Sequence, residues 1–566
     1  MLKWTAVTLL AVVIALTVAI AVALRRAEPV LRAAILSTLE DRFHARVELA
    51  GFHVSLLGGL RAEGKGLRIW LPAGYLEDAG LSPGAPIEVR GSQRPLLAVD
   101  EFRFRAPLHY APGMPIHIPV VQVRGLTIDV PPKERFLRSN TDLSGTGNRA
   151  NATQGLIRFA VDNLDCEDAR LILETSKPGK QPLEFAIPRL KLTGIQRDVS
   201  MHFTAELTNP RPVGTIHTAG TFGPWTVEDP GESAIQGEYR FDHANLGDFR
   251  EIAGTLNSTG KYAGTLRDVT VDGSTDTPDF RITHFGSPMR LRTEFRAKVD
   301  ATNGDTWLDA VNATLGESPF TAEGRIVRVA DEGGRGEKNG QARLSRGRDI
   351  FLTVHVPRGR IEDFLKLASK DGTPLLTGVL TMNASLDIPP GNTPLTQRMS
   401  LKGWFSLQDA RFTSAKVQDR MAELSLRGQG EPKQAKDTSG AAEVRAAMTS
   451  DFTMAGGTIS FPNLKYTMPG ADIDLAGTYS VEGGTLSFAG KARMQATVSQ
   501  MLGGWKGVLA KPVDRFFKKD GAGTEVGIHI DGTAADPQFG INLERMKKSS
   551  PQRPGEIQQT PEDSAH

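Results

Sequence analysis

Cysteine, net charge and catalytic motifs are all scarce in this chain of 566 residues. Cys166 is the only cysteine, which excludes intramolecular disulfides and cysteine-rich zinc sites. The 67 Lys and Arg residues nearly balance the 65 Asp and Glu residues, so a net charge of +2 offers no global field for nucleic acid. Hydrophobic residues make up only 39% of the chain, which argues against long continuous buried cores.

Motifs for common enzyme chemistry are also missing. The sequence contains no HExxH and no GxxxxGK[ST] pattern. The closest histidine pair, His109 and His117, is too widely spaced to ligate a metal from one helix or turn. Acidic neighbours of Cys166 predict a raised thiol pKa, which argues against a nucleophile. We therefore expect no enzyme activity, no catalytic residue, no cofactor and no metal site.

One long apolar segment is present at the N-terminus. Trp4–Leu24 contains no charged residue and no proline, and as a helix it would span roughly 30 Å, the thickness of a bilayer core. We predict a transmembrane anchor at residues 1–26, with cleavage as a signal peptide near Ala21-Val22-Ala23 as the alternative. Arg25 and Arg26 follow the span and favour a cytoplasmic chain, although long domains translocate regardless of flanking charge.

The next segment predicts an amphipathic helix within residues 27–46. Apolar residues recur there at three-to-four spacing, namely Val30, Leu31, Ala34, Ile35, Leu39 and Phe43. Such a helix either lies on the lipid surface or caps the first part of a sheet.

From Val47 onward the apolar period is two, which indicates β-strands. The clearest strand is Met289–Asp300, in which apolar side chains alternate with charged ones, so one face is apolar and the other is wet. Glycines inside many strands indicate a curved sheet. We predict a mainly β fold: an elongated, curved, mostly antiparallel β-sheet groove after the transmembrane helix, with short helices at Arg360–Ala368 and Val498–Lys519. The expected regions are residues 47–240, 241–390 and 391–546, followed by a disordered tail at 547–566.

The apolar face of such a sheet needs a cover, because contiguous apolar surface is not left in water. Either two sheets pack into a closed sandwich, or the sheet forms a trough that accepts an apolar ligand. The candidate residues of this face are Met289, Leu291, Phe295, Val299, Leu380, Met382, Leu386, Leu401, Phe405 and Leu407.

Several stretches together resemble the AsmA family of bacterial envelope proteins. These are the anchor and helix ending at Phe43–Leu49, then Val54–Arg61 and Gly66–Ile69, and later Met399–Thr413, Val417–Leu426, Phe516–Thr533 and Pro537–Phe539. The resemblance implies a single-pass bacterial inner-membrane protein with the bulk of its chain in the periplasm. It also implies kinship with repeating β-groove proteins that carry lipids between membranes.

Taken with the apolar face, this resemblance favours an envelope-biogenesis protein without enzymatic activity that binds or conducts lipids, such as phospholipids, along an apolar β-groove. Its expected partners are lipid, the inner membrane through Trp4–Leu24 and envelope proteins, but not nucleic acid. The alternative is an assembly scaffold that binds protein partners. A third interpretation is a polysaccharide-acting β-solenoid enzyme.

Overall fold

A computed structural model of the chain describes most of its strands and several helices. The described residues are 28–40, 46–55, 60–70, 95–106, 116–130, 159–173, 182–195, 199–224, 230–249, 251–283, 286–328, 348–367, 374–391, 393–437, 444–502, 524–534 and 536–542. The predicted anchor, the predicted tail and most of the predicted helix at Val498–Lys519 lie outside these residues. Within the part that is described, no helix combines the length and the hydropathy of a membrane span.

The fold is mainly β, as predicted: 24 strands belong to one mixed sheet, and two short strands form a separate pair. Contacts divide the chain into two units, which we describe separately. The first comprises Met1–Val356, Lys366–Gly372 and Asp387–Asn392, and the second comprises Pro357–Leu365, Thr373–Leu386 and Thr393–His566. The region boundaries that we predicted after residues 240 and 390 stay predictions.

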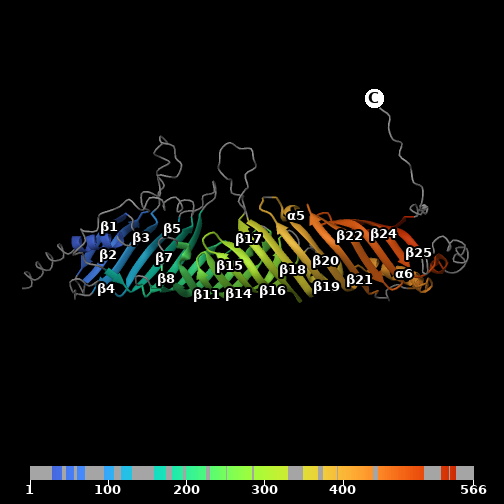
Figure 1. Ribbon diagram of the computed structural model, residues 1–566, viewed down its shortest axis with the longest axis horizontal. Coiled ribbons are helices and arrows are strands. Elements are labelled where there is room, and N and C mark those ends of the chain that lie inside the picture. The colour runs from blue at the N-terminus through green and yellow to red at the C-terminus, as the bar shows by residue number, and fades with distance from the viewer. Residues whose placement is uncertain are drawn as a thin grey trace, which may run out of the picture. The chain divides into compact units, whose positions relative to one another are not determined.

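The first unit is built from a helix at residues 28–40 and successive strands that lie side by side in chain order (Figure 1). The strands are β1 (Val47–Ser55), β2 (Leu60–Ile69), β3 (Leu97–Ala106), β4 (Ile116–Ile118), β5 (Val121–Val130), β6 (Phe159–Val161), β7 (Asn163–Leu173), β8 (Leu183–Thr193), β9 (Met201–Pro210), β10 (Val213–Phe222), β11 (Ala234–Asn245), β12 (Ile252–Ala253), β13 (Thr255–Thr265), β14 (Asp268–Ile282), β15 (Met289–Asp300), β16 (Asp305–Leu315), β17 (Ser318–Arg328) and β18 (Arg348–Arg360). Short 3-10 turns occur at η2 (Pro230–Glu232) and η3 (Leu246–Asp248).

Pairing in this unit is antiparallel between chain neighbours, with β5 and β7 as a parallel exception in the main sheet. The two short strands β4 and β6 also pair in parallel. The antiparallel order explains the alternation seen in the sequence, because a meander can bury one face and leave the other in water. The mostly antiparallel sheet that the sequence predicted is therefore confirmed.

A backbone irregularity crosses the first strands at one level. Gly66, Gly125 and Asp168 all have positive φ, on β2, β5 and β7. On β3, β5 and β7, core residues three apart then point to the same side: Val99 with Phe102, Val123 with Leu126, and Cys166 with Ala169 all join one hydrophobic cluster. The alternation therefore shifts by one residue here.

The helix at residues 28–40 packs on this cluster. Leu31, Ala34 and Ile35 are buried, and Ile35 contacts the cluster that contains Phe102, Phe104 and Val121. The predicted amphipathic helix is thus found, and its apolar side caps the first strands of the sheet.

The second unit continues the same architecture with more helices. Its strands are β19 (Leu376–Ile388), β20 (Ser400–Phe412), β21 (Ala446–Ala455), β22 (Thr458–Met468), β23 (Ala471–Ser480), β24 (Thr485–Met494), β25 (Thr524–Thr533) and β26 (Pro537–Asn542). Its helices are α4 (Ile361–Lys366), α5 (Leu395–Arg398), α6 (Ala415–Gly428), α7 (Gln434–Asp437) and α8 (Val498–Leu502). The short helix predicted at Arg360–Ala368 corresponds to α4.

Helix α6 was not predicted from the sequence. Val417, Met421 and Ala422 form its buried stripe, and α6 contacts β20 and β23. Its C-terminal end is held where Ser425 Oγ donates to the backbone oxygen of Pro469 at 2.6 Å. The helix therefore covers one end of the apolar face of β20–β24, where Met468, among other sheet residues, is buried.

The close seat of α6 gives a stability prediction. A Cβ on Gly428 would lie 2.4 Å from the backbone oxygen of Gly470, which has no freedom to yield. Gly428→Ala should therefore lower the unfolding free energy by about 1–2 kcal/mol, since overpacking outweighs the better helix propensity of alanine. Urea denaturation of the full-length protein measures the change.

Gly483→Ala is the matched control in the same unit. Its Cβ would meet nothing closer than 3.6 Å, so its effect should stay within about 0.5 kcal/mol. Equal unfolding midpoints for the two variants would show that α6 is not seated as described.

Candidate functional site

Strand β15 separates an apolar face from a charged face, with the bounds that the sequence predicted. Four predicted residues of the apolar face, Met289, Leu291, Phe295 and Val299, are all half-buried there. The residues between them point the other way and are exposed, Arg290, Arg292, Glu294, Arg296 and Lys298. The apolar face of β15 thus has neither the full burial of a dry core nor the exposure of a polar surface.

One row of opposed residues follows this apolar face through the first unit. Directly opposed residues share a face, and the row runs Phe102, Val123, Cys166, Leu190, Ala205, Thr218, Tyr239, Gly260, Gly273 and Phe295. Its first members are buried in the cluster with the helix at residues 28–40. From Thr218 onward its side chains are half-exposed. The apolar face is therefore covered at its beginning and accessible further on.

The predicted residues of the second unit divide in the same way. Leu380 and Leu407 are each only 1% exposed and belong to the packed core. Met382, Leu386, Leu401 and Phe405 are half-buried. The structure therefore places the predicted residues of β19 and β20 in two environments, one dry and one partly open.

A row of phenylalanines occupies the open part of this second apolar face. Phe405 contacts Phe452 and Phe461, with ring centroids 6.2 and 6.3 Å apart, and Phe461 contacts Phe488 at 5.8 Å. Gly477 lies opposite both Phe461 and Phe488, and a Cβ there would come within 2.6 Å of the Phe488 ring. Sequence reasoning selected only Phe405, although all four rings sit on the apolar side of alternating strands.

The opposite face of the first unit carries charges that alternate in sign from strand to strand. Register places Lys65, Glu101, Arg124, Glu167, Arg189 and Glu206 opposite one another in that order. Opposite charges on paired strands stabilise a sheet, whereas like charges would destabilise it. We call this side of the sheet the charged face. Its cross-strand pairs of opposite charge stabilise the strand register, and its charged side chains keep this side solvated.

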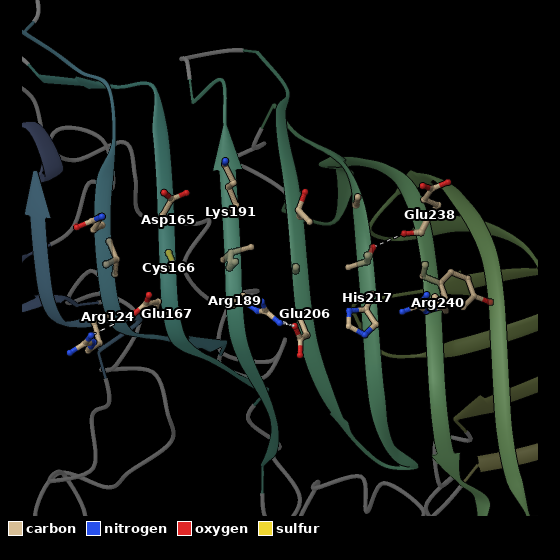
Figure 2. Close-up of a pocket in the computed structure, with 18 of the residues that line it drawn as sticks. Arg124, Asp165, Cys166, Glu167, Arg189, Lys191, Glu206, His217, Glu238 and Arg240 are labelled. Carbon is tan, nitrogen blue, oxygen red and sulfur yellow. Dashed lines mark hydrogen bonds and ion pairs between the residues drawn. The ribbon is translucent and has the colours of Figure 1, made fainter.

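A broad concavity of about 1180 Å³ is lined by these charged residues and also by members of the row on the apolar face, among them Cys166, Leu190 and Tyr239 (Figure 2). Arg189 and Glu206 form its closest ion pair, with nitrogen–oxygen distances of 2.5 and 3.1 Å, and Arg124 and Glu167 lie 3.4 Å apart. The lining also includes Asp165, Lys191, His217, Glu238 and Arg240 (Figure 2). Positive and negative groups are mixed throughout, so the concavity does not single out an anion or a cation.

Hydrogen bonding and burial shift the pKa values of two groups in this region. The hydrogen bond from Arg103 holds the pKa of Glu101 below its usual range. Burial, with a smaller effect of Asp165, raises the pKa of the Cys166 thiol to about 12, in agreement with the expectation that this cysteine is not a nucleophile. Among the described residues, His, Cys, Asp and Glu side chains form no group suited to a metal ion. The distinctive chemical feature is therefore the half-covered apolar face.

The two environments on β20 give a testable contrast. Leu407→Ala removes a buried side chain and should lower the unfolding free energy by about 2–4 kcal/mol. Leu401→Ala, on the same strand and face, removes a half-exposed side chain and should lower it by less than half as much. Chemical denaturation of both variants measures the difference, and equal losses would contradict an open Leu401.

Comparisons with family models, with curated proteins and with solved structures find no match to this chain.

Proposed function

We propose that this chain is an AsmA-like envelope protein that holds lipid acyl chains on the apolar face of its sheet. The observation that supports this proposal is the half-burial of apolar side chains on one face of the strands, Leu291, Phe295 and Val299 in the first unit and the residues from Leu401 to Phe488 in the second. A surface of this kind is unfavourable in water and is satisfied by an apolar occupant.

An acyl chain suits this surface in both chemistry and energy. Burial contributes about 0.8 kcal/mol per CH₂, so even partial burial of a long chain gives several kcal/mol. Apolar contacts are not directional, and a chain can therefore shift along the face without breaking specific bonds. Lipid binding and lipid conduction are both compatible with such a surface.

The proposal includes a location. Trp4–Leu24 would anchor the chain in the inner membrane, with the bulk of the chain in the periplasm and phospholipid as its ligand. The apolar face of the sheet then forms an open trough that holds the lipid, rather than the inside of a closed sandwich of two sheets. A scaffold function remains the competing proposal, in which an envelope protein covers the same apolar face.

Photocrosslinking in living cells tests the proposal and separates these occupants. Benzoylphenylalanine placed at Phe295 and at Phe405 should form lipid adducts, because both side chains are half-buried on the apolar face. The same probe at Arg292 and at Trp404, which are exposed, should form none. Mass spectrometry of the adducts identifies what was captured.

The outcomes are distinct. Protein adducts at Phe295 and Phe405 would support the scaffold and contradict lipid binding. Adducts with residues of the chain itself would indicate a closed, dry core. Lipid adducts at all four positions would show only that the chain lies near a membrane.

A further inference from the structure

The row of opposed residues on the apolar face loses its aliphatic side chains in the middle of the first unit. Between Ala205 on β9 and Phe295 on β15 it runs through Thr218, Tyr239, Gly260 and Gly273. Hydroxyl groups and glycines thus separate the apolar residues on either side. An acyl chain crosses this stretch favourably only if the hydroxyls are bonded within the sheet, because an unsatisfied polar group is costly to cover with hydrocarbon.

Tyr262 on β13 lies across this stretch. Its directly opposed residue on β11 is Gly237, and a Cβ on Gly237 would lie 2.7 Å from the Tyr262 hydroxyl oxygen. The ring therefore passes over β11 at the one place where no side chain stands in its way. Its hydroxyl oxygen reaches β10, where it lies 2.7 Å from Thr218 Oγ1.

The direction of this hydrogen bond follows from the second contact of Thr218. Its Oγ1 donates its only proton to the backbone oxygen of Glu238 at 2.9 Å, and a carbonyl oxygen can only accept. Both contacts form together only when Tyr262 donates to Thr218. Burial raises the pKa of the Tyr262 phenol, which therefore keeps its proton near neutral pH. The two hydroxyl protons thus both end on acceptors within the sheet.

Tyr239 on β11 repeats the arrangement in the opposite direction. Its ring lies over Gly260 on β13, where a Cβ would come within 2.8 Å of it, and its hydroxyl contacts Ser258 Oγ at 3.0 Å. The hydroxyl lies beside Gly273 on β14, so it points away from that of Tyr262. The two ring centroids are 6.5 Å apart. This stretch therefore consists largely of aromatic rings whose hydroxyls are bonded to the sheet at their far ends.

We propose that Thr218 is a positioning residue that holds the Tyr262 hydroxyl against the sheet, so that an unsubstituted acyl chain can cross the middle of the first unit over the phenol ring. The hydroxyl of Thr218, rather than its size, carries this role, because only the hydroxyl accepts the phenol proton. Without it, the phenol donor has to be covered unsatisfied when a chain lies over it. This inference rests on the proposed function and names a residue that keeps the apolar face continuous.

Photocrosslinking at two positions tests this role in full-length protein in phosphatidylcholine nanodiscs, with alkyne-tagged palmitate as the probe. Benzoylphenylalanine replaces Ile235, which is half-buried on the same face of β11 two residues from Gly237, or Phe405 as the reference in the second unit. The palmitate concentration that gives half of the maximal adduct is measured at each position. Thr218→Val keeps the shape of the side chain without the hydroxyl, and should raise this concentration about tenfold at position 235 but not at position 405.

Removal of the phenol hydroxyl should rescue this loss. Thr218→Val/Tyr262→Phe should return the half-saturating concentration at position 235 to within about twofold of the wild-type value, which a mere packing defect at Thr218 would not allow. Tyr262→Phe alone should also stay within about twofold, since it removes a hydroxyl that does not face the ligand. Thr218→Ser is the matched control, because it keeps the acceptor and should change neither position.

The outcomes separate this inference from the proposed function. An unchanged concentration in Thr218→Val, or no rescue in the double variant, overturns the role of Thr218. Several-fold tighter binding at position 235 in Tyr262→Phe shows that the hydroxyl already faces the ligand, and overturns the inference even if Thr218→Val does not fold. Wild-type adducts at position 405 but none at position 235 overturn the inference alone. If neither position forms adducts, the proposed lipid binding fails as well.

Discussion

The alternation of side chains along antiparallel strands is the constraint from which the other features follow. Each strand must send successive residues to opposite faces, and consecutive pairing carries the two faces from strand to strand. In the first unit this produces one row from Phe102 to Phe295 and, on the other side, the row of alternating charges from Lys65 to Glu206. An apolar surface and a charged surface thus lie back to back in a single sheet layer.

The cover of the apolar surface differs along each unit. The helix at residues 28–40 buries the first strands, and α6 buries one end of β20–β24. Outside these covered parts, Phe295 in the first unit and Phe405 in the second are half-exposed, and glycines such as Gly273 and Gly477 let aromatic rings lie low on the sheet. The helices therefore determine which parts of the surface are core and which parts are available to a ligand.

Sequence periodicity predicted the strands well where alternation is unbroken, as in β15, whose bounds it placed correctly. A pattern of period two cannot describe β5 around Gly125, where a positive φ shifts the alternation within the strand. It missed α6, although Val417 and Met421 are four residues apart and share a helical face. The paired hydroxyls of Tyr239 and Tyr262 were also missed, because their partners are 19 and 44 residues away.

The most direct test of an open apolar face is the environment of a spin label at position 295. The label would be attached through Phe295→Cys in a Cys166→Ala background, in membrane-bound full-length protein, and its collisions with oxygen and with a water-soluble nickel complex would be measured. An acyl-lined face predicts frequent collisions with oxygen and few with nickel, while Arg292→Cys on the charged face should collide freely with nickel. Infrequent collisions with both reagents at position 295, as in a dry core, would contradict the account, and so would frequent collisions with nickel.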